Sequence, residues 1–267
     1  MLQKQFMKGV LLVCLLLFLS CQIPRIAVDN GNWQANSSFD VKGRNRVLLR
    51  QKLSFGNYRT LFVKRSSTKR SDWDVLGGVG VAANWAERSQ VDFVRRGQTV
   101  RFALTDATNR QSQVIACSRA SWADLRIGTN PNSLVSIIGD LLQAGDAGSS
   151  TYAVRIVTAP DTAPWEMIID NNAAQRRGGN WQGYLAKSRE YYYTIEPVAQ
   201  LTGRNGTAVL LPFGGAVGYA FRNKAGGVVA AVSLIDRGMV YFGTVDTDEQ
   251  FLLANAMAAL LLQEKPD

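Results

Sequence analysis

A run of basic residues between positions 42 and 70 is the strongest chemical signal in this chain of 267 residues. The first five cations stand at even positions, so an extended strand would place them on one outward face, about 6 to 7 Å apart. A row of cations at this spacing can bind anionic lipid, polymer or protein, and we predict ligand binding by part of the run. The run holds no acidic residue and ends with Lys69 and Arg70. Its predicted ligand-binding members are the other eight cations: Lys42, Arg44, Arg46, Arg50, Lys52, Arg59, Lys64 and Arg65.

The same run has a simpler interpretation. Outward strand positions must be polar, and cations also protect an edge strand from pairing with another chain. No aromatic stacking platform is interleaved with the run, which argues against a nucleic-acid partner. Removing the signal described below leaves a net charge of about +7, because it takes two of the 30 basic residues and none of the 21 acidic ones.

Histidine is absent from the chain, and this absence excludes many reaction types. Ser-His-Asp and Cys-His hydrolases, His-ligated zinc sites and imidazole acid-base catalysis all need it. Carboxylate chemistry through Glu166 or Asp236 with a nearby lysine stays open, but no spacing supports it. We therefore predict a protein that is not an enzyme, with no metal site and no cofactor.

Two tight acidic clusters have structural explanations. Asp72 and Asp74 follow a Ser/Thr/Lys-rich stretch and are typical of a turn. Asp246, Asp248 and Glu249 indicate a helix start, with Thr247 expected to cap the amide of Gln250.

The elements that would position these residues are mostly strands. Short β-branched and aromatic segments alternate with Gly, Asn, Asp or Pro, which is typical of an all-β, mainly antiparallel fold. A short helix is predicted over 133–143 and an exposed loop over 171–183. The predicted strands are 38–42, 46–53, 58–64, 90–94, 98–104, 112–118, 151–157, 165–169, 191–196, 207–212, 217–222, 227–234 and 238–245.

A second helix, predicted over 249–263, decides the architecture. Between positions 251 and 262 only Asn255 is polar. A helix that is apolar on every side must be surrounded on every side, and this one is too short to span a bilayer. A large closed β-barrel of about a dozen strands around this helix meets the requirement. The alternative is a helix packed between a sheet and other elements, or against a partner.

The first 21 residues resemble a bacterial lipoprotein export signal. Lys4 and Lys8 precede a ten-residue apolar run, and Cys21 follows Phe-Leu-Ser as in a lipobox. We predict acylation of Cys21, palmitate included, and a lipid anchor at the bacterial cell envelope, on the periplasmic side of the outer membrane. A secretory signal cut elsewhere and a short uncleaved anchor are the alternatives. Cys117 would then be the one unmodified cysteine, so no intramolecular disulfide can form, and it is expected to be a buried apolar residue.

These patterns predict a single globular domain. Residues 1–20 form the signal, 21–36 an N-terminal tether, and 37–267 one β-barrel with a helical or loop insertion near 120–190.

The C-terminal part resembles the closing segment of tubby-like proteins. The resemblance covers 195–263: a β-meander over 217–232, the segment Met-Val-Tyr-Phe-Gly-Thr-Val over 239–245, and the apolar helix. The superfamily includes the LURP-type proteins and the phospholipid scramblases. It implies a twelve-stranded barrel around a hydrophobic C-terminal helix. No site residue of that superfamily matches a position here.

Two functions are consistent with the sequence. The first is an anchored, non-catalytic module whose basic face binds an anionic lipid, polymer or protein. The second is a structural or assembly subunit of an envelope complex, with Trp165, Trp181 and Tyr191 to Tyr193 as its contact surface. Those aromatic residues could instead fill the core or cover one barrel mouth.

Overall fold

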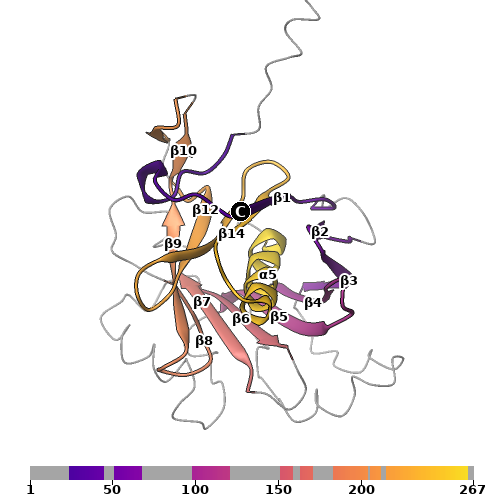
Figure 1. The fold of residues 1–267 in the computed structure, drawn as a ribbon. Helices are drawn as coiled ribbons and strands as arrows, with labels where there is room; N and C mark the ends of the chain where they lie inside the picture. The colour runs from indigo at the N-terminus through magenta and orange to yellow at the C-terminus, as the bar shows by residue number, and fades with distance from the viewer. Residues whose placement is uncertain are drawn as a thin grey trace, which may run out of the picture.

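The computed structural model describes residues 24–44, 51–67, 98–120, 151–158, 163–170, 183–203, 205–211 and 215–263. Within these ranges the chain is mostly strand, with one α-helix, α5 (Thr247–Leu262), and a single 3-10 turn, η2 (Asp29–Gly31) (Figure 1). The strands are β1 (Ser37–Asp40), β2 (Ser54–Phe55), β3 (Tyr58–Ser67), β4 (Gln98–Thr105), β5 (Gln111–Ala120), β6 (Thr151–Val157), β7 (Trp165–Asp170), β8 (Gly183–Ala186), β9 (Tyr192–Val198), β10 (Gln200–Thr202), β11 (Ala208–Leu210), β12 (Gly218–Arg222), β13 (Val228–Ser233) and β14 (Met239–Phe242).

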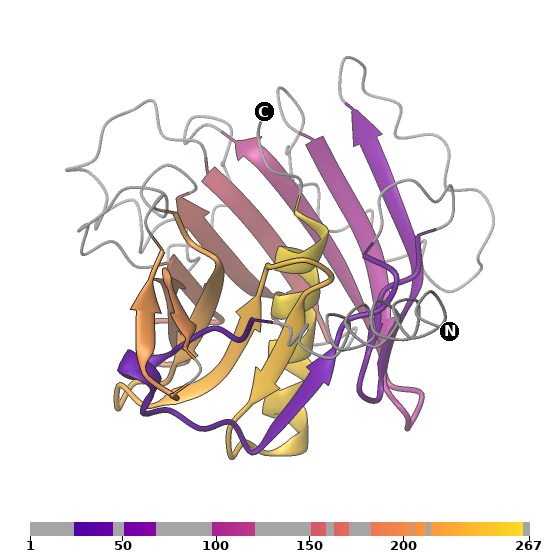
Figure 2. The same ribbon diagram turned by 90° about the horizontal axis from the view of Figure 1, so that it is seen from above.

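Twelve of the strands form one antiparallel sheet in the order β1-β14-β13-β12-β9-β8-β7-β6-β5-β4-β3-β2. The two ends of this sheet meet. Lys42, just after β1, and Ser54 of β2 exchange two backbone hydrogen bonds of 2.8 and 3.0 Å. The sheet is therefore a nearly closed barrel, and the prediction of an all-β barrel of about a dozen strands is confirmed (Figures 1 and 2). The remaining two strands, β10 and β11, form a separate hairpin.

The interior of the barrel is filled by α5. Every second residue of the wall strands points inward, as the period of two requires. On β4 these residues are Val100, Phe102 and Leu104, which belong to one buried cluster with the whole of Phe251 to Leu262. No flank of the helix from Phe251 onward is exposed, which confirms the predicted enclosed helix (Figure 2).

The first turn of α5 is capped one residue earlier than predicted. Asp246, not Thr247, is the N-cap: its carboxylate accepts hydrogen bonds from the amides of Asp248 (2.9 Å) and Glu249 (2.8 Å). A carboxylate also interacts more favourably than a hydroxyl with the positive end of the helix dipole.

Residues 24–36 lie on the outside of the barrel. Ile26 and Val28 form a second buried cluster with outward side chains of β9, β12, β13 and β14, such as Val198, Ala231 and Tyr241. Backbone hydrogen bonds join Ala27 N to Gln200 O (2.9 Å) and Thr202 N to Arg25 O (2.8 Å). From Arg25 onward the segment predicted as a tether is thus docked on the wall.

Most predicted strands within the described ranges match observed strands, with a few differences. The segment predicted over 46–53 is not a strand at 51–53, and 45–50 lie outside the described residues, as do the predicted strand 90–94 and the predicted helix 133–143. The predicted loop 171–183 overlaps the described residues only at Gly183, which begins strand β8. The short strands β2, β8 and β10 were not predicted.

Candidate functional site: outward and inward cations around one helix

The structure divides the predicted basic face into two groups. Lys42, Lys52, Arg59 and Lys64 point outward and are exposed, whereas Arg44 and Arg65 reach the C-terminal end of α5. Arg46, Arg50, Lys69 and Arg70 lie outside the described residues. We call the first group the outer cationic strip and the second the inner arginine pair.

The outer cationic strip runs across three strands at the point where the barrel closes. Lys42 pairs with Ser54, and Ser54 pairs with Arg59, so Lys42 and Arg59 flank Ser54 on one face. Adjacent strands are separated by about 4.8 Å, which puts the backbones at Lys42 and Arg59 about 10 Å apart. Lys52 lies two residues before Ser54, and its neighbour Leu53 points into the core, so Lys52 shares the outward face.

The strip is electrostatically open. Lys42, Lys52, Arg59 and Lys64 form no ion pair with any other described residue. The run from Lys42 to Arg70 contains no acidic residue, and the carboxylate next to it along the chain is the exposed Asp40, which forms no ion pair with the strip. An anionic group approaching this face would therefore meet cations that are not already paired within the described part of the chain.

An aromatic side chain that the sequence analysis passed over lies at one end of the strip. Lys64 Nζ is 5.7 Å from the centre of the Phe62 ring, and Phe62 is 39% exposed. Leu61, beside it, is 40% exposed. A signal was present, because Phe62 and Lys64 are two residues apart and so share a strand face. The strip thus combines cations with a small apolar edge.

The inner arginine pair supplies the cations that α5 itself lacks in its last turn. Arg44 Nε donates to Leu261 O (3.2 Å), and Arg65 Nη1 donates to Leu262 O (3.1 Å). The final carbonyls of a helix have no partner within the helix and carry its negative end. The guanidinium groups at this end bond these carbonyls and stabilise the helix inside the barrel.

Further hydrogen bonds hold the two arginines in place. Arg44 Nη1 also donates to Leu234 O (2.7 Å) and Asp236 O (3.0 Å), and Arg65 Nη2 donates to Gln51 Oε1 (2.9 Å). Both side chains therefore serve the fold, and the prediction that Arg44 shares an outward face with Lys42 and Lys52 is wrong.

Two local features of the backbone explain why alternation along the chain does not place all of these cations on one outward face. Gly43 has φ +78°, and a Cβ placed there would lie 1.7 Å from Lys52 O, so only glycine fits. This turn breaks the extended chain between Lys42 and Arg44 and sends the second side chain inward. On β3 the register shifts between Thr60 and Phe62, which leaves Lys64 on the outward face and Arg65 on the inward face opposite Val100, where its side chain reaches the end of α5 and stays partly open to solvent.

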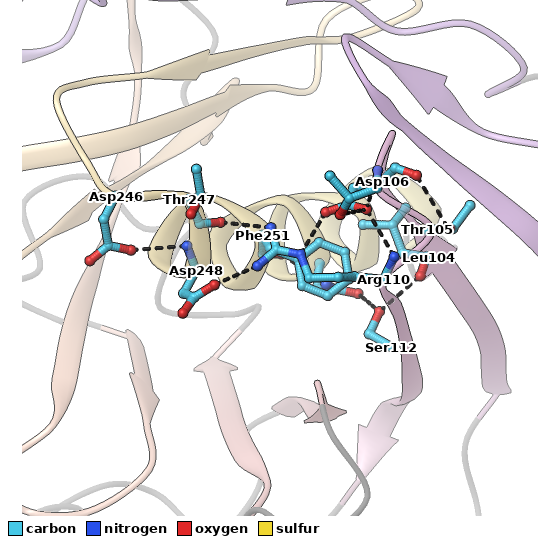
Figure 3. A network of polar contacts seen from close by, with 11 residues as sticks. Leu104, Thr105, Asp106, Arg110, Ser112, Asp246, Thr247, Asp248 and Phe251 are labelled. Carbon is cyan, nitrogen blue, oxygen red and sulfur yellow. Dashed lines mark hydrogen bonds and ion pairs between the residues drawn. The ribbon is translucent and has the colours of Figure 1, made fainter.

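At the N-terminal end of α5 the barrel wall holds the helix through Arg110 (Figure 3). Its guanidinium donates hydrogen bonds to Asp106 Oδ2 (2.6 Å), Asp248 Oδ1 (2.5 Å) and Thr247 O (3.0 Å). The same group lies 4.8 Å from the centre of the Phe251 ring. Burial raises the pKa of Asp106, but hydrogen bonds from Arg110 and Thr108 outweigh it and hold the pKa below its usual value.

Two wall side chains satisfy the polar groups in the middle of the helix. Asn255 donates from Nδ2 to Phe251 O (2.8 Å), and its Oδ1 accepts from Ser112 (2.5 Å). Tyr152 donates from its hydroxyl to Ala259 O (2.7 Å), and burial raises the pKa of this phenol well above its usual value. A phenol held neutral in this way is a hydrogen-bond donor at physiological pH, not an acid-base group.

Neither carboxylate considered for catalysis forms an ion pair with a lysine among the described residues. Glu166 is buried in an ion pair with Arg155 across β6 and β7 (3.0 Å), and Asp236 lies in the exposed turn before β14 with φ +48°. Among the described residues no three His, Cys, Asp or Glu side chains are grouped to hold a metal ion. Asp72 and Asp74 lie outside the described residues, and Cys117 is buried, as predicted, and forms no disulfide with a described residue.

The aromatic residues predicted as a contact surface are mostly part of the wall. Trp165 and Tyr193 lie 5.9 Å apart between ring centres, pack against the core, and Tyr193 donates to Glu249 (2.9 Å). Tyr192 is partly buried beside Tyr184, and only Tyr191, 66% exposed, is open to solvent. Trp181 lies outside the described residues. These positions favour the simpler interpretation that the aromatic residues complete the barrel.

Two further observations bear on membrane attachment and relatedness. Cys21 lies outside the described residues, and within the described ranges no helix is long and apolar enough to cross a membrane. The chain matches no protein-family model, and no curated protein and no solved structure matches it.

Proposed function

We propose that this chain is a lipid-anchored, non-catalytic protein of the bacterial envelope whose outer cationic strip binds an anionic partner. The observation that carries the proposal is the set of four exposed cations, Lys42, Lys52, Arg59 and Lys64, which form no ion pair with other described residues. The lipobox-like residues before Cys21 support the anchor. The barrel around an apolar helix is the fold that the tubby-like resemblance implies, and the resemblance itself stays a prediction.

The chemistry of the strip defines the class of ligand. Phosphate and carboxylate groups are anions that a row of exposed ammonium and guanidinium groups attracts. The attraction depends on salt, because the screening length falls from about 10 Å at 0.1 M to about 3 Å at 1 M ionic strength. A lipid headgroup and an acidic polymer share this chemistry, and the experiment must separate them.

The test compares two triple charge reversals in the full-length protein, anchored in neutral phosphatidylcholine vesicles. The strip variant carries Lys42→Glu, Lys52→Glu and Arg59→Glu, which reverse three of the four charges of the strip. The matched control reverses three exposed cations elsewhere, Lys187→Glu, Arg189→Glu and Arg237→Glu, and changes the net charge equally. Two probes are added separately: vesicles containing phosphatidylglycerol, and polyglutamate.

We expect the strip variant to lose at least tenfold in affinity for one probe at low salt, while the control loses much less. The wild type should lose the same binding as salt rises toward 1 M. Whichever probe responds identifies the source of the anion. Equal losses in both variants would show that only net charge matters, and a wild type that ignores both probes would overturn the binding function.

A further inference from the structure

The hairpin β10–β11 presents apolar side chains to solvent. Val209 and Leu210 of β11 are 51% and 58% exposed, and they project from opposite faces of the strand. Two large apolar side chains exposed on one short strand are available for contact with another apolar surface.

The same hairpin is fixed to the first described residues of the chain. Ile26 forms a bridge with Leu201, and Arg25 O accepts a hydrogen bond from Thr202 N (2.8 Å). Residues 25–27 thus run antiparallel beside β10 and bridge to it at Ile26. Arg222, which pairs with Asp29 and with Glu196 (2.6 Å), holds the following residues against the barrel.

The distance to the anchor follows from chain length. Cys21 precedes Arg25 by four residues, and an extended chain spans at most about 3.6 Å per residue. A lipid on Cys21 would therefore keep Arg25, and the hairpin bonded to it, within about 15 Å of the acylated residue. The membrane itself is the apolar surface within reach of a hairpin held so near it.

We propose that the β10–β11 hairpin rests on the membrane that carries the anchor, with Val209 and Leu210 in its interfacial layer. This inference rests on the lipid anchor of the proposed function. The hairpin segment 199–211 contains no acidic residue that an anionic membrane would repel. Two points of attachment, the acyl group and the hairpin, would fix the orientation of the barrel on the surface.

This orientation has a consequence for the outer cationic strip. Residues 24–36 cover the wall at β9, β12, β13 and β14, whereas the strip follows β1 and continues on β2 and β3. Figures 1 and 2 show β10 and the first described residues on one side of the barrel and β3 on the other. The strip thus lies on the face next to the covered wall, since β1 is the neighbour of β14 in the sheet, and its cations stay open to a partner in the aqueous space.

The experiment places an environment-sensitive fluorophore on single cysteines of the full-length protein, purified from membranes and reconstituted in phosphatidylcholine–phosphatidylglycerol vesicles. Leu210→Cys reports on the hairpin. Ala225→Cys, in the exposed turn beyond the far end of β12, and Lys52→Cys, on the strip, are the controls. Cys117 is buried, so unsubstituted protein measures background labelling. Mass spectrometry of the N-terminal peptide establishes acylation in each sample.

We expect a blue-shifted emission at position 210 that is quenched several-fold by lipids carrying a nitroxide, with water-like emission at 225 and 52. Acylated protein whose probe at 210 stays in water would overturn this inference and leave the anchor intact. Membrane-like emission at 52 or 225 but not at 210 would also overturn it. An N-terminal peptide without an acyl group would overturn the anchor itself and the inference with it.

Discussion

The inner arginine pair and the outer cationic strip come from one stretch of sequence but behave as two different regions. Arg44 and Arg65 are bonded to the final carbonyls of α5, whereas Lys42 and Lys52 have exposed side chains without ion pairs to described residues. A run of like charges is therefore not one site. The strand face that each residue occupies decides whether its charge stabilises the fold or is available to a ligand.

The chemistry of the two side-chain types agrees with this division. Both inward residues are arginines, and each donates several hydrogen bonds from one planar group. A guanidinium is more weakly hydrated than an ammonium and can satisfy several carbonyls at once. Three of the four outward residues are lysines, whose compact, strongly hydrated charge suits a surface position.

The substitution with the largest expected effect places a charge inside the barrel, on α5. Ala258→Asp puts a carboxylate where the side chain is fully buried and no cation faces it among the described neighbours in the core cluster. A buried unpaired charge costs several kcal/mol, against a total stability of about 5 to 15 kcal/mol. We expect loss of the folded protein, measured by circular dichroism and yield, and the same for Ala256→Asp and Leu260→Asp.

The matched control is Ala225→Asp, the same substitution in an exposed turn. It should change the melting temperature by no more than about 2 °C, since surface changes stay within about 0.5 kcal/mol. A folded, thermally stable Ala258→Asp protein would contradict the enclosed helix.

A finer test compares the two kinds of cation directly. Arg65→Gln removes a charged donor from Leu262 O, and we expect a loss of about 1.5 to 3 kcal/mol in the free energy of unfolding, measured with urea. Arg44→Gln should behave alike, because it frees Leu234 O as well as Leu261 O. Lys42→Gln and Lys52→Gln should stay within about 0.5 kcal/mol of the wild type. Equal losses of unfolding free energy at all four positions would show that the inner arginine pair contributes no more to stability than the outer cationic strip.

The smallest expected effect is a change in the pH dependence of stability, through Asp106 at the N-terminal end of α5. The pKa of Asp106 is lower in the folded protein than its unfolded value of about 3.9, so the folded state favours the ionised form. Its contribution to stability is present above about pH 4 and is lost as pH falls through the folded pKa. Asp106→Asn keeps the acceptor oxygen for Thr108 and Arg110 but cannot titrate.

We therefore expect unfolding free energy to fall less between pH 5 and pH 2 in Asp106→Asn than in the wild type. Asp236→Asn, which removes an exposed carboxylate outside any described ion pair, is the control and should follow the wild type. Identical slopes in all three proteins would mean that the Arg110 network does not stabilise the folded state through Asp106.

Much of the architecture was accessible from sequence. The apolar stretch from Phe251 to Leu262 could be satisfied only by complete enclosure, and alternating residues such as Val100, Phe102 and Leu104 supplied the wall that encloses it. These predictions succeeded because burial of a whole segment depends on local composition and period, which a single sequence records.

The assignment of the cations needed the tertiary structure. The conformation of Gly43 depends on its close approach to Lys52, and the shifted register of β3 is defined only against β4. The carbonyls that Arg44 and Arg65 satisfy belong to a helix about 200 residues further along the chain. A single sequence is enough to predict that a barrel surrounds an apolar helix and that one segment is strongly basic. Which cations bond the end of the helix and which are left for a ligand depends on contacts between segments far apart in the chain, and these contacts exist only in the folded protein.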